Sequence, residues 1–322
     1  MAEVRTLMVA DAEDGVRLDR WFRRRWPHLS NVQIQKLARS GQIRVDGARA
    51  KAETRLIAGA QVRVPPLPPA GPAEPRDTLS SHDRAFVRGL VLYEDDEVLA
   101  LNKPAGIAVQ GGTKTHRHID RLLAAWGDGP KRPRLVHRLD RDTSGVLVLG
   151  KSPAAAARLA GAFARRRSQK TYWAIVAGTP KPGEGVIDIP LAKQGFGDRE
   201  LVAPAEPKDP RAESAQTEFV TISRAAQTAA WLALKPVTGR THQLRAHMLA
   251  VGHPILGDPK YNTEASDVLS GELKLQLHAR RIVLPHPGGG DLVLEAPISP
   301  ELRAGFERFG FEEHEASDDP FG

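Results

Sequence analysis

The chain contains no cysteine among its 322 residues. This absence excludes a disulfide framework, a thiolate nucleophile, an iron–sulfur cluster and the usual thiolate sites for zinc. Long apolar runs are also missing. No stretch reaches the length of about 18 apolar residues that a membrane-spanning helix needs. The first residues lack the basic and then apolar layout of a signal peptide. We therefore expect a soluble, cytoplasmic protein without a membrane partner.

Acidic residues are fewer than basic ones, 39 against 46, and most of the basic residues are arginine. Arginine suits nucleic-acid recognition because its planar guanidinium binds phosphates and base edges. Arginine is also frequent, together with alanine, glycine and proline, in proteins encoded by GC-rich DNA. Composition does not choose between these explanations, so the placement of the arginines has to decide.

A proline-rich stretch divides the chain. Six of the eleven residues 65–75 are proline, which excludes a helix or a central strand and favours an extended, semi-rigid spacer. The length of the chain also suggests about two domains. We predict a small domain over residues 16–64, a linker over 65–80 and a larger domain over 81–310. Residues 311–322 carry acids without lysine or arginine, and we expect an acidic, frayed tail there.

The small domain is expected to begin with two helices and to end in short strands. Apolar residues recur at helical spacing from Leu18 to Trp26, where Pro27 ends the helix. Ser30 is a candidate N-cap for a second helix. Further along lie a strand near 43–45, a turn at Asp46-Gly47 and a strand near 62–64.

Positive charge is concentrated in this small domain. Residues 17–65 contain 12 lysines and arginines against 3 acidic residues. The polar face of the first predicted helix carries Arg20, Arg23, Arg24 and Arg25. The two helices, the segment "QIRVDG" at 42–47 and the late strand resemble an S4 RNA-binding domain, which implies that this face contacts RNA. The alternative is that the charged face is only solvated.

The larger domain mixes strand and helix patterns. We expect a hairpin over 91–101, a helix near 117–126, a buried strand over 146–149 and a helix over 153–167. Polar residues crowd the loop that precedes the buried strand, at 137–144.

Several chemistries are open to that loop. Asp140 and Asp142 could bind a metal, although the flanking arginines would repel a cation. Ser144 could be a nucleophile, although the G-x-S-x-G pattern is absent. An aspartate among arginines stays ionised, as a nucleophile or an electrostatic stabiliser requires. The loop could also hold a simple network of ion pairs.

Two later segments add functional side chains. Residues 170–178 form a predicted strand that carries Tyr172, and residues 238–247 form a turn into a helix with Arg240 and Arg245. The histidines of the second segment are five residues apart, so they do not share a helix face as the zinc-binding pair of HExxH does. We therefore expect no metal site.

Taken together, "HRLDRDTSG" at 137–145, "KTYWAIVAG" at 170–178 and "TGRTHQLRAH" at 238–247 resemble the RluA family of RNA pseudouridine synthases. Support comes from "LYEDDEVLALNKPAG" at 92–106, "GHPILGD" at 252–258 and "LQLHA" at 275–279. The likeness is nearest to the S4-bearing RluC and RluD types, although Gln110 stands where histidine is expected. It implies an α+β fold with a central mixed, mostly antiparallel sheet and the active cleft across it.

The resemblance also implies roles for individual residues. The family reaction breaks the N1–C1′ bond of uridine, turns the uracil and rejoins it through C5 without a cofactor. Asp140 falls on the catalytic aspartate, Arg245 on the arginine that pairs with it, and Tyr172 on the tyrosine that stacks on the base. Arg138 falls on a residue that enters the RNA helix where the uridine has flipped out, and flipping is necessary because the reacting atoms are inaccessible in a stack. Arg141 and Arg240 are further candidate RNA contacts.

We therefore expect a monomeric, metal-free and cofactor-free enzyme that converts specific uridines of large-subunit (23S) ribosomal RNA to pseudouridine. Two alternatives remain open from the sequence. One is a pseudouridine synthase for transfer RNA, and the other is a non-catalytic RNA-binding or ribosome-assembly protein.

Overall fold

The computed structural model describes residues 4–68, 79–111, 117–196, 199–206 and 208–321. The chain forms two compact units, Met1–Thr78 and Leu79–Gly322. The boundary falls within the stretch expected to be a linker, of which residues 69–78 lie outside the described residues. Within the described ranges, no helix has the length and apolar composition needed to cross a membrane.

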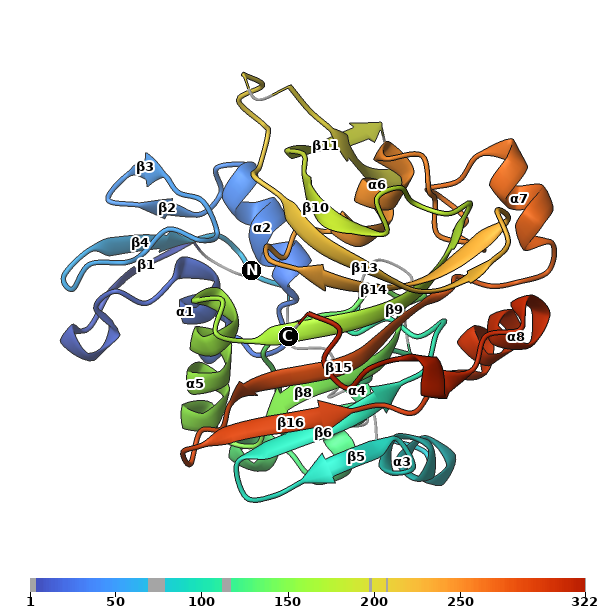
Figure 1. Ribbon diagram of the computed structural model, residues 1–322. Helices are drawn as coiled ribbons and strands as arrows, with labels where there is room; N and C mark the ends of the chain where they lie inside the picture. Colours follow the sequence, from blue (N-terminus) through green and yellow to red (C-terminus); the bar gives the residue numbers. More distant parts are fainter. Residues whose placement is uncertain (1–3, 69–78, 112–116, 197–198, 207, 322) are drawn as a thin grey trace. The chain divides into compact units, whose positions relative to one another are not determined.

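The N-terminal unit combines two helices with a four-stranded antiparallel sheet (Figure 1). Its elements are β1 (Arg5–Met8), a 3₁₀ turn η1 (Asp11–Glu13), α1 (Leu18–Arg25), α2 (Asn31–Arg39), β2 (Arg44–Val45), β3 (Ala48–Arg49) and β4 (Gln61–Val64). The strands follow the order β1-β4-β2-β3. Trp21 and Phe22 of α1 are wholly buried with Ile34 of α2, so the apolar spacing predicted both helices.

Local signals fix the ends of these elements. The Ser30 hydroxyl accepts a hydrogen bond from the Gln33 N–H and caps α2. Asp46 and Gly47 have φ of 48° and 78°, as a tight hairpin between β2 and β3 requires. The unit begins earlier than residue 16, because β1 pairs with β4. A four-residue strand with one partner has too short a pattern to be identified from sequence.

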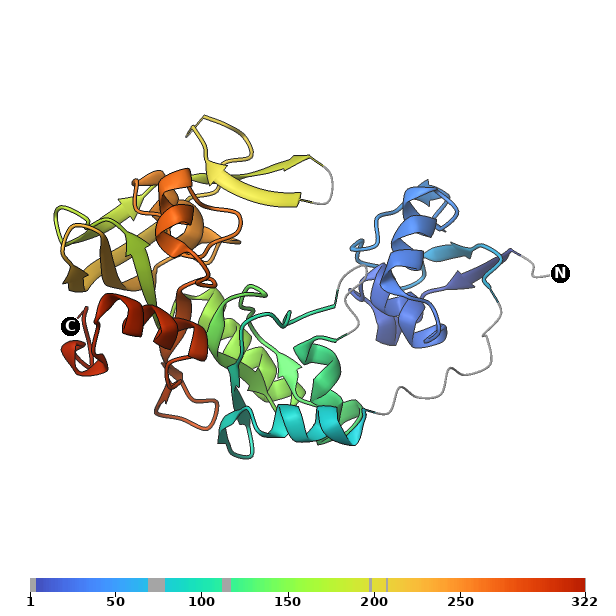
Figure 2. The ribbon, with the colours of Figure 1, turned by 90° about the vertical axis from the view of Figure 1, so that its right-hand side faces the viewer.

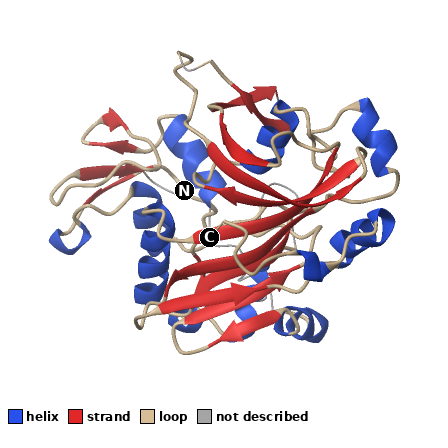
Figure 3. Ribbon diagram, viewed as in Figure 1, coloured by secondary structure: helices blue, strands red, loops and turns tan. Residues whose placement is uncertain are grey.

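The C-terminal unit is built on one large sheet with the order β10-β13-β14-β9-β15-β8-β6-β5 (Figures 1 and 3). The strands are β5 (Val91–Glu94), β6 (Val98–Lys103), β8 (Ser144–Gly150), β9 (Gln169–Ala177), β10 (Glu184–Asp188), β13 (Gln216–Ala225), β14 (Ala229–Pro236) and β15 (Leu277–Pro285). Two further strands, β7 (Arg134–Leu135) and β16 (Asp291–Glu295), pair with β8 and β15. Among the named strands of the described residues, only β8 and β15 pair in parallel, so the predicted mixed, mostly antiparallel sheet and the α+β class are confirmed.

Helices and a separate hairpin complete this unit. The helices are α3 (Ser81–Arg88), α4 (Ile119–Leu122), α5 (Pro153–Ala164), α6 (Gln243–Ala250), α7 (Glu264–Ser270) and α8 (Pro300–Phe309). Short 3₁₀ turns are η2 (Leu123–Trp126), η3 (Gly129–Lys131) and η4 (Glu313–Glu315), and the hairpin joins β11 (Leu191–Phe196) to β12 (Arg199–Pro204). The helix expected near 117–126 is therefore one α-helical turn followed by a 3₁₀ turn, and the helix expected to reach residue 167 ends at Ala164.

Neighbouring side chains of the central strands pack against helices on opposite faces of the sheet. Leu99 of β6 and Leu147 of β8 pack with α3 and α4. Their neighbours Val98 and Val146 pack with Leu159 of α5. Successive side chains of a strand point to opposite faces, so a continuous apolar run is what a strand buried on both faces requires.

The same division holds in the other half of the sheet. Leu232 of β14 packs with Leu244 of α6, whereas Trp231 packs with Phe306 of α8 at a ring-centroid distance of 4.6 Å. The start of α6 is thereby fixed against β14.

The acidic C-terminal segment is packed rather than frayed. Phe311 is only 5% exposed and lies in the cluster around Trp231. Ser223 of β13 donates a hydrogen bond to Glu315, and Arg303 of α8 donates one to Glu313. The segment thus turns back beside α8, as Figure 2 shows in red. Its buried aromatic residue and the contacts of its glutamates together hold it in position.

Candidate active site

A cavity of about 570 Å³ lies beside the loop that joins β7 to β8. Its wall is formed by this loop, the end of α5, the beginning of β9 and the turn that leads into α6. Cavities that hold small molecules span roughly 300–1,000 Å³, so the volume is that of a ligand site.

The loop over residues 136–143 lies where β8 changes its pairing partner. On this edge, β8 pairs with β15 only at residues 144–145 and with β7 at 149–150. Between these points the Val148 N–H donates to His137 Nε2 at 2.8 Å. Gly145 has φ of +111°, and a Cβ there would clash with the Ala279 carbonyl. The first histidine and the last glycine of "HRLDRDTSG" therefore hold the loop against the sheet.

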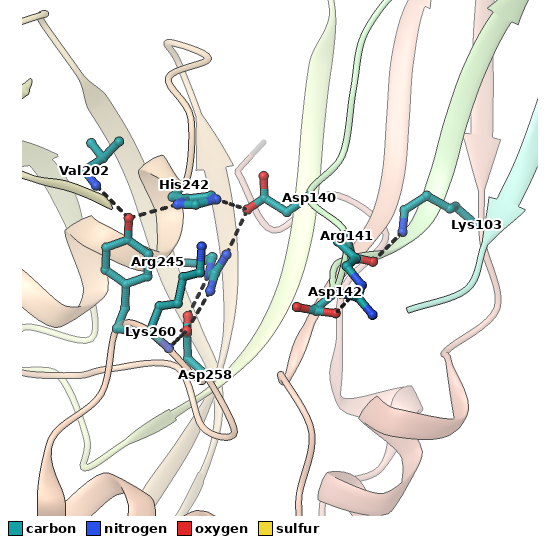
Figure 4. Close-up of polar contacts among 10 residues, drawn as sticks. Lys103, Asp140, Arg141, Asp142, Val202, His242, Arg245, Asp258 and Lys260 are labelled. Carbon is teal, nitrogen blue, oxygen red and sulfur yellow. Dashed lines mark hydrogen bonds and ion pairs between the residues drawn. The ribbon is translucent and has the colours of Figure 1, made fainter. Parts of the chain in front are cut away.

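A buried lysine fixes the middle of the loop. Lys103 at the end of β6 has no exposed surface. Its ammonium donates to the carbonyls of Pro104, Ile107 and Arg141 at 2.9, 3.0 and 3.0 Å (Figure 4 shows the bond to Arg141). Burial lowers the pKa of Lys103 to about 8, although Asp142 and Asp140 act in the opposite direction. A surface contact between this lysine and RNA is therefore excluded.

Three charged side chains meet at the cavity (Figure 4). Arg245 Nη1 lies 3.2 Å from Asp140 Oδ2, and Arg245 donates through Nε and Nη2 to both oxygens of Asp258 at 2.7 Å each. Asp258 also accepts the N–H groups of Lys260 and Tyr261 at 2.9 and 3.0 Å. Asp258 is wholly buried, Arg245 is nearly so, and the Asp140 side chain is 21% exposed. Asp140 is thus the member of the set that a ligand can reach.

The electrostatics of this set favour a charged guanidinium. Burial would lower the pKa of Arg245, but the hydrogen bonds and charges of Asp258 and Asp140 outweigh it and raise that pKa above its usual range. The bidentate geometry leaves Nη1 free to approach Asp140. Asp258 therefore orients Arg245, and Arg245 orients Asp140.

A histidine approaches the same carboxylate oxygen (Figure 4). His242 Nε2 lies 3.8 Å from Asp140 Oδ2, and Nδ1 lies 2.9 Å from the Tyr261 hydroxyl. That hydroxyl accepts the Val202 N–H at 2.9 Å, so its proton is available to His242 Nδ1. Burial lowers the pKa of His242, with Arg245 adding to the effect and Asp140 opposing it. In a neutral ring with its proton on Nε2, Nδ1 accepts the hydrogen bond from the Tyr261 hydroxyl and the N–H faces Asp140.

Tyr172 lies on β9 and forms part of the cavity wall. Its ring packs against two apolar clusters of the sheet. Burial first, and the charge of Asp140 second, raise the pKa of Tyr172 far above its usual value. The phenol therefore stays protonated at any physiological pH, next to the carboxylate.

The arginines predicted to contact RNA differ in their pairing. Arg240 forms an ion pair with Glu213 at 2.5 Å and donates to the Ser214 carbonyl. Arg141 is largely exposed and donates through Nε to the Gly106 carbonyl at 3.1 Å. Arg138 lines the cavity, and no side chain in the described residues pairs with it. Of the three, Arg138 has a guanidinium that is available to a ligand.

A similar distinction holds on α1 of the N-terminal unit. Arg20, Arg23 and Arg24 are exposed. Arg25, by contrast, binds Glu13 at 2.6 Å and stacks over the Trp21 ring at 3.9 Å. The exposed arginines remain candidates for RNA contacts, whereas Arg25 stabilises its own unit.

The described residues show no arrangement that fits a serine nucleophile or a metal site in this loop. The Ser144 hydroxyl lies 2.9 Å from His278 Nδ1, but both side chains are buried and neither lines the cavity. Burial lowers the pKa of His278 to about 4, so the ring is neutral. Across the described residues, no three His, Asp or Glu side chains gather as the ligands of a metal would.

The structure brings Asp140, Tyr172 and Arg245 together in the lining of one cavity. Sequence reasoning did not identify Asp258 or the pair of His242 and Tyr261. Asp258 was visible in the segment "GHPILGD", but nothing in that segment indicated its partner.

The family model and the known proteins that match this chain name the same kind of enzyme. Residues 97–250 match the RNA pseudouridylate synthase family. The ribosomal large subunit pseudouridine synthase C of Escherichia coli K12 is 33% identical over 308 residues, covering 93% of this chain and 95% of the relative. The enzyme of the same name from Vibrio parahaemolyticus is 33% identical over 311 residues, covering 94% and 96%.

Solved structures support the same assignment. The human RNA pseudouridylate synthase domain containing 4 has a TM-score of 0.60 and 26% identity, covering 73% of this chain and 99% of its own. The human RNA pseudouridylate synthase domain containing 1 has a TM-score of 0.56 and 25% identity, covering 66% and 86%. Motifs, sheet and relatives agree, and the chain belongs to the RluA family of RNA pseudouridine synthases.

Proposed function

We propose that this protein converts specific uridines of large-subunit ribosomal RNA to pseudouridine, with Asp140 as the catalytic residue. Its curated relatives at 33–34% identity carry the name of a large-subunit pseudouridine synthase and match nearly their whole length. The observation that supports the site most directly is the relay of Asp258, Arg245 and Asp140, which presents one oriented carboxylate to a cavity of nucleotide-binding size.

The proposed reaction is an isomerisation, so no group is gained or lost overall. The N1–C1′ bond breaks, a C5–C1′ bond forms, C5 loses a proton and N1 gains one. Asp140 acts at the sugar, as a nucleophile or as a base, when the N1–C1′ bond breaks. A carboxylate is used in the same way at the anomeric carbon in glycosidases. Arg245 keeps the carboxylate oriented through a charge-assisted hydrogen bond. Such a reaction consumes no cofactor.

Two further side chains would hold the flipped nucleotide. Tyr172 offers the face of a protonated phenol to the uracil, and stacking of a base on an aromatic ring contributes about 1–3 kcal/mol. Arg138 carries a guanidinium without an acidic partner in the described part of the chain. We infer that it occupies the space that the flipped uridine leaves.

The N-terminal unit is proposed to be an S4-like domain that binds RNA through Arg20, Arg23 and Arg24. Replacing all three with alanine should weaken RNA binding and lower the slope of log Kd against log salt by about 2, since each phosphate contact contributes roughly 0.7–0.9. The unfolding temperature should not change, because the side chains are exposed. An unchanged slope would contradict this role. We further propose that the protein works as a monomer in the cytoplasm, which light scattering and fractionation test.

The activity is tested with unmodified 23S ribosomal RNA. Wild-type protein should introduce pseudouridines that carbodiimide treatment reveals as stops in primer extension, and Asp140→Asn should give none. Asp142→Asn is the matched control, because Asp142 is a partly exposed aspartate of the same loop that pairs with Arg141 and not with Arg245. Stops that persist in Asp140→Asn would exclude Asp140 as the catalytic residue. Stops in transfer RNA alone, or none in either RNA, would favour one of the two alternatives.

A further inference from the structure

The cavity wall continues from Tyr172 along β9 to residues that the proposed chemistry does not use. Lys170 and Tyr172 are two positions apart on this strand, so their side chains lie on the same face, roughly 6–7 Å apart along the strand. Ser168 and Arg166, which precede β9, also line the cavity. The cavity is therefore longer than the part that surrounds Asp140.

The charges along this wall are unbalanced. The lining contains five cationic side chains and a single carboxylate, Asp140. Arg245 and Arg240 pair with carboxylates. For the other three, Arg138, Arg166 and Lys170, no acidic partner exists among the described residues.

Lys170 is the most informative of the unpaired cations. It is partly buried in the cavity wall, and burial lowers its pKa. The charge of Lys170 also acts on His137, whose ring is neutral because burial, with Lys170 adding to the effect, lowers its pKa to about 3. A buried ammonium is unfavourable unless it is paired, so this position is suited to a ligand that supplies a negative charge.

Two local features support an anion at this place. The Ser168 hydroxyl is buried and has no hydrogen-bond partner within the described structure, although buried hydroxyls normally have one. The cation Arg166 lies two positions after the last residue of α5 and lines the same cavity. The carbonyl end of α5 by itself repels an anion, so the attraction must come from these side chains.

We propose that Lys170, Ser168 and Arg166 form a subsite for a phosphodiester of the RNA next to the flipped uridine. This inference rests on the proposed function, because it takes the nucleotide stacked on Tyr172 as its reference point. The RNA backbone supplies one negative charge per nucleotide, and a nucleotide held at Tyr172 places a neighbouring phosphate within reach of Lys170. The subsite binds the strand and positions the nucleotide without contacting the reacting atoms.

The test is a binding experiment that does not depend on turnover. A stem-loop RNA containing the mapped uridine is prepared with phosphodiesters throughout, or with one uncharged methylphosphonate on the 5′ or the 3′ side of that uridine. Affinities are measured by fluorescence anisotropy for two proteins that both carry Asp140→Asn. One retains Lys170, and the other also carries Lys170→Met. Lys274→Met serves as the matched control, because Lys274 is exposed and lies outside the cavity lining.

We expect Lys170→Met and one of the two methylphosphonates each to weaken binding about tenfold, and the combination to weaken it no further. Lys170→Met should also reduce the salt slope by about 0.7–0.9, the value for one phosphate contact, while Lys274→Met leaves it unchanged. Lys170→Arg should keep the sensitivity to the methylphosphonate, which separates loss of charge from loss of folding. The subsite would be overturned if Lys170→Met leaves the affinity unchanged. It would also be overturned if, for both the 5′ and the 3′ methylphosphonate, the loss of affinity multiplies with the loss caused by Lys170→Met. Failure of the proposed function would be seen separately, as a wild-type enzyme that binds RNA but forms no pseudouridine.

Discussion

Replacing Asp258 with asparagine is the sharpest perturbation that the site offers. The substitution preserves size but removes the charge, and it places an NH₂ group where one carboxylate oxygen stood. The remaining oxygen can still accept the N–H groups of Lys260 and Tyr261, which lie 2.9 and 3.0 Å from Oδ1. The new NH₂ group would then face Arg245 Nε, which donates to Asp258 Oδ2 at 2.7 Å. Two donors cannot satisfy each other. The fork, which is the pair of hydrogen bonds from Arg245 to Asp258, therefore opens.

The expected magnitude follows from burial. Removing one partner of a buried ion pair costs about 3–5 kcal/mol, and Asp140 still compensates part of the charge of Arg245, so we expect about 3 kcal/mol. For a unit of this size, that loss lowers the unfolding temperature by roughly 6–12 °C. Once the fork is open, Arg245 Nη1 no longer holds Asp140 at a fixed position. Misplacing a reacting group by about 1 Å costs on the order of 100-fold in rate, so kcat should fall about 100-fold while KM changes little.

Single-turnover kinetics and calorimetry measure both effects. Asp209→Asn is a matched control, because Asp209 binds Arg211 through Nε and Nη2 at 3.0 and 2.8 Å in the same two-bond geometry, but on the surface. It should leave both kcat and the unfolding temperature unchanged. If Asp258→Asn lowers the unfolding temperature but keeps kcat within threefold of wild type, Asp258 stabilises the fold without orienting Asp140. If neither value moves, the reasoning from the buried fork is wrong.

Three further outcomes are expected. Lys103→Met removes the donor for three carbonyls, including that of Arg141, and should destabilise the protein by at least about 3 kcal/mol in urea unfolding; a smaller loss would show that water replaces the ammonium. Because burial raises the pKa of Tyr172, the rate should show no change near pH 10 that depends on Tyr172, so wild type and Tyr172→Phe should have parallel profiles up to pH 10.5. Burial lowers the pKa of His278 from 6.5 to about 4, so below pH 6.5 the unfolded chain binds a proton that the folded chain does not. Stability should therefore fall as the pH drops from 6.5 to 5, by up to about 1.4 kcal/mol per unit from this group, and His278→Gln should flatten that slope in urea titrations.

Much of the fold was predictable because its signals are local. The spacing from Leu18 to Trp26 and the cap at Ser30 predicted α1 and α2. The apolar run at 146–149 predicted β8, which is buried on both faces. The order of the strands was not predictable from periodicity, because the pairings of β15 with β8 and β9 join residues more than a hundred positions apart. The family resemblance supplied the class of sheet instead.

The site shows the same division between local and distant information. Asp140, Tyr172 and Arg245 lie in motifs that the sequence displays, and the structure places all three at one cavity. Asp258 follows Arg245 by 13 residues with no periodic relation, so only the folded chain shows that the two side chains meet. The burial of Lys103 was also hidden, because a lysine at the end of a strand is normally exposed.

The placement of arginine, rather than its abundance, carries the functional information. A GC-rich coding sequence would raise the arginine content, but it would not determine which guanidinium groups acquire acidic partners. Arg25 and Arg240, which the sequence could not distinguish from their neighbours, pair with Glu13 and Glu213. Arg138, in contrast, lies unpaired in the described part of a cavity wall that contains five cations and one carboxylate. Such an imbalance costs stability in the free protein, and a polyanionic substrate that neutralises it would recover that free energy on binding.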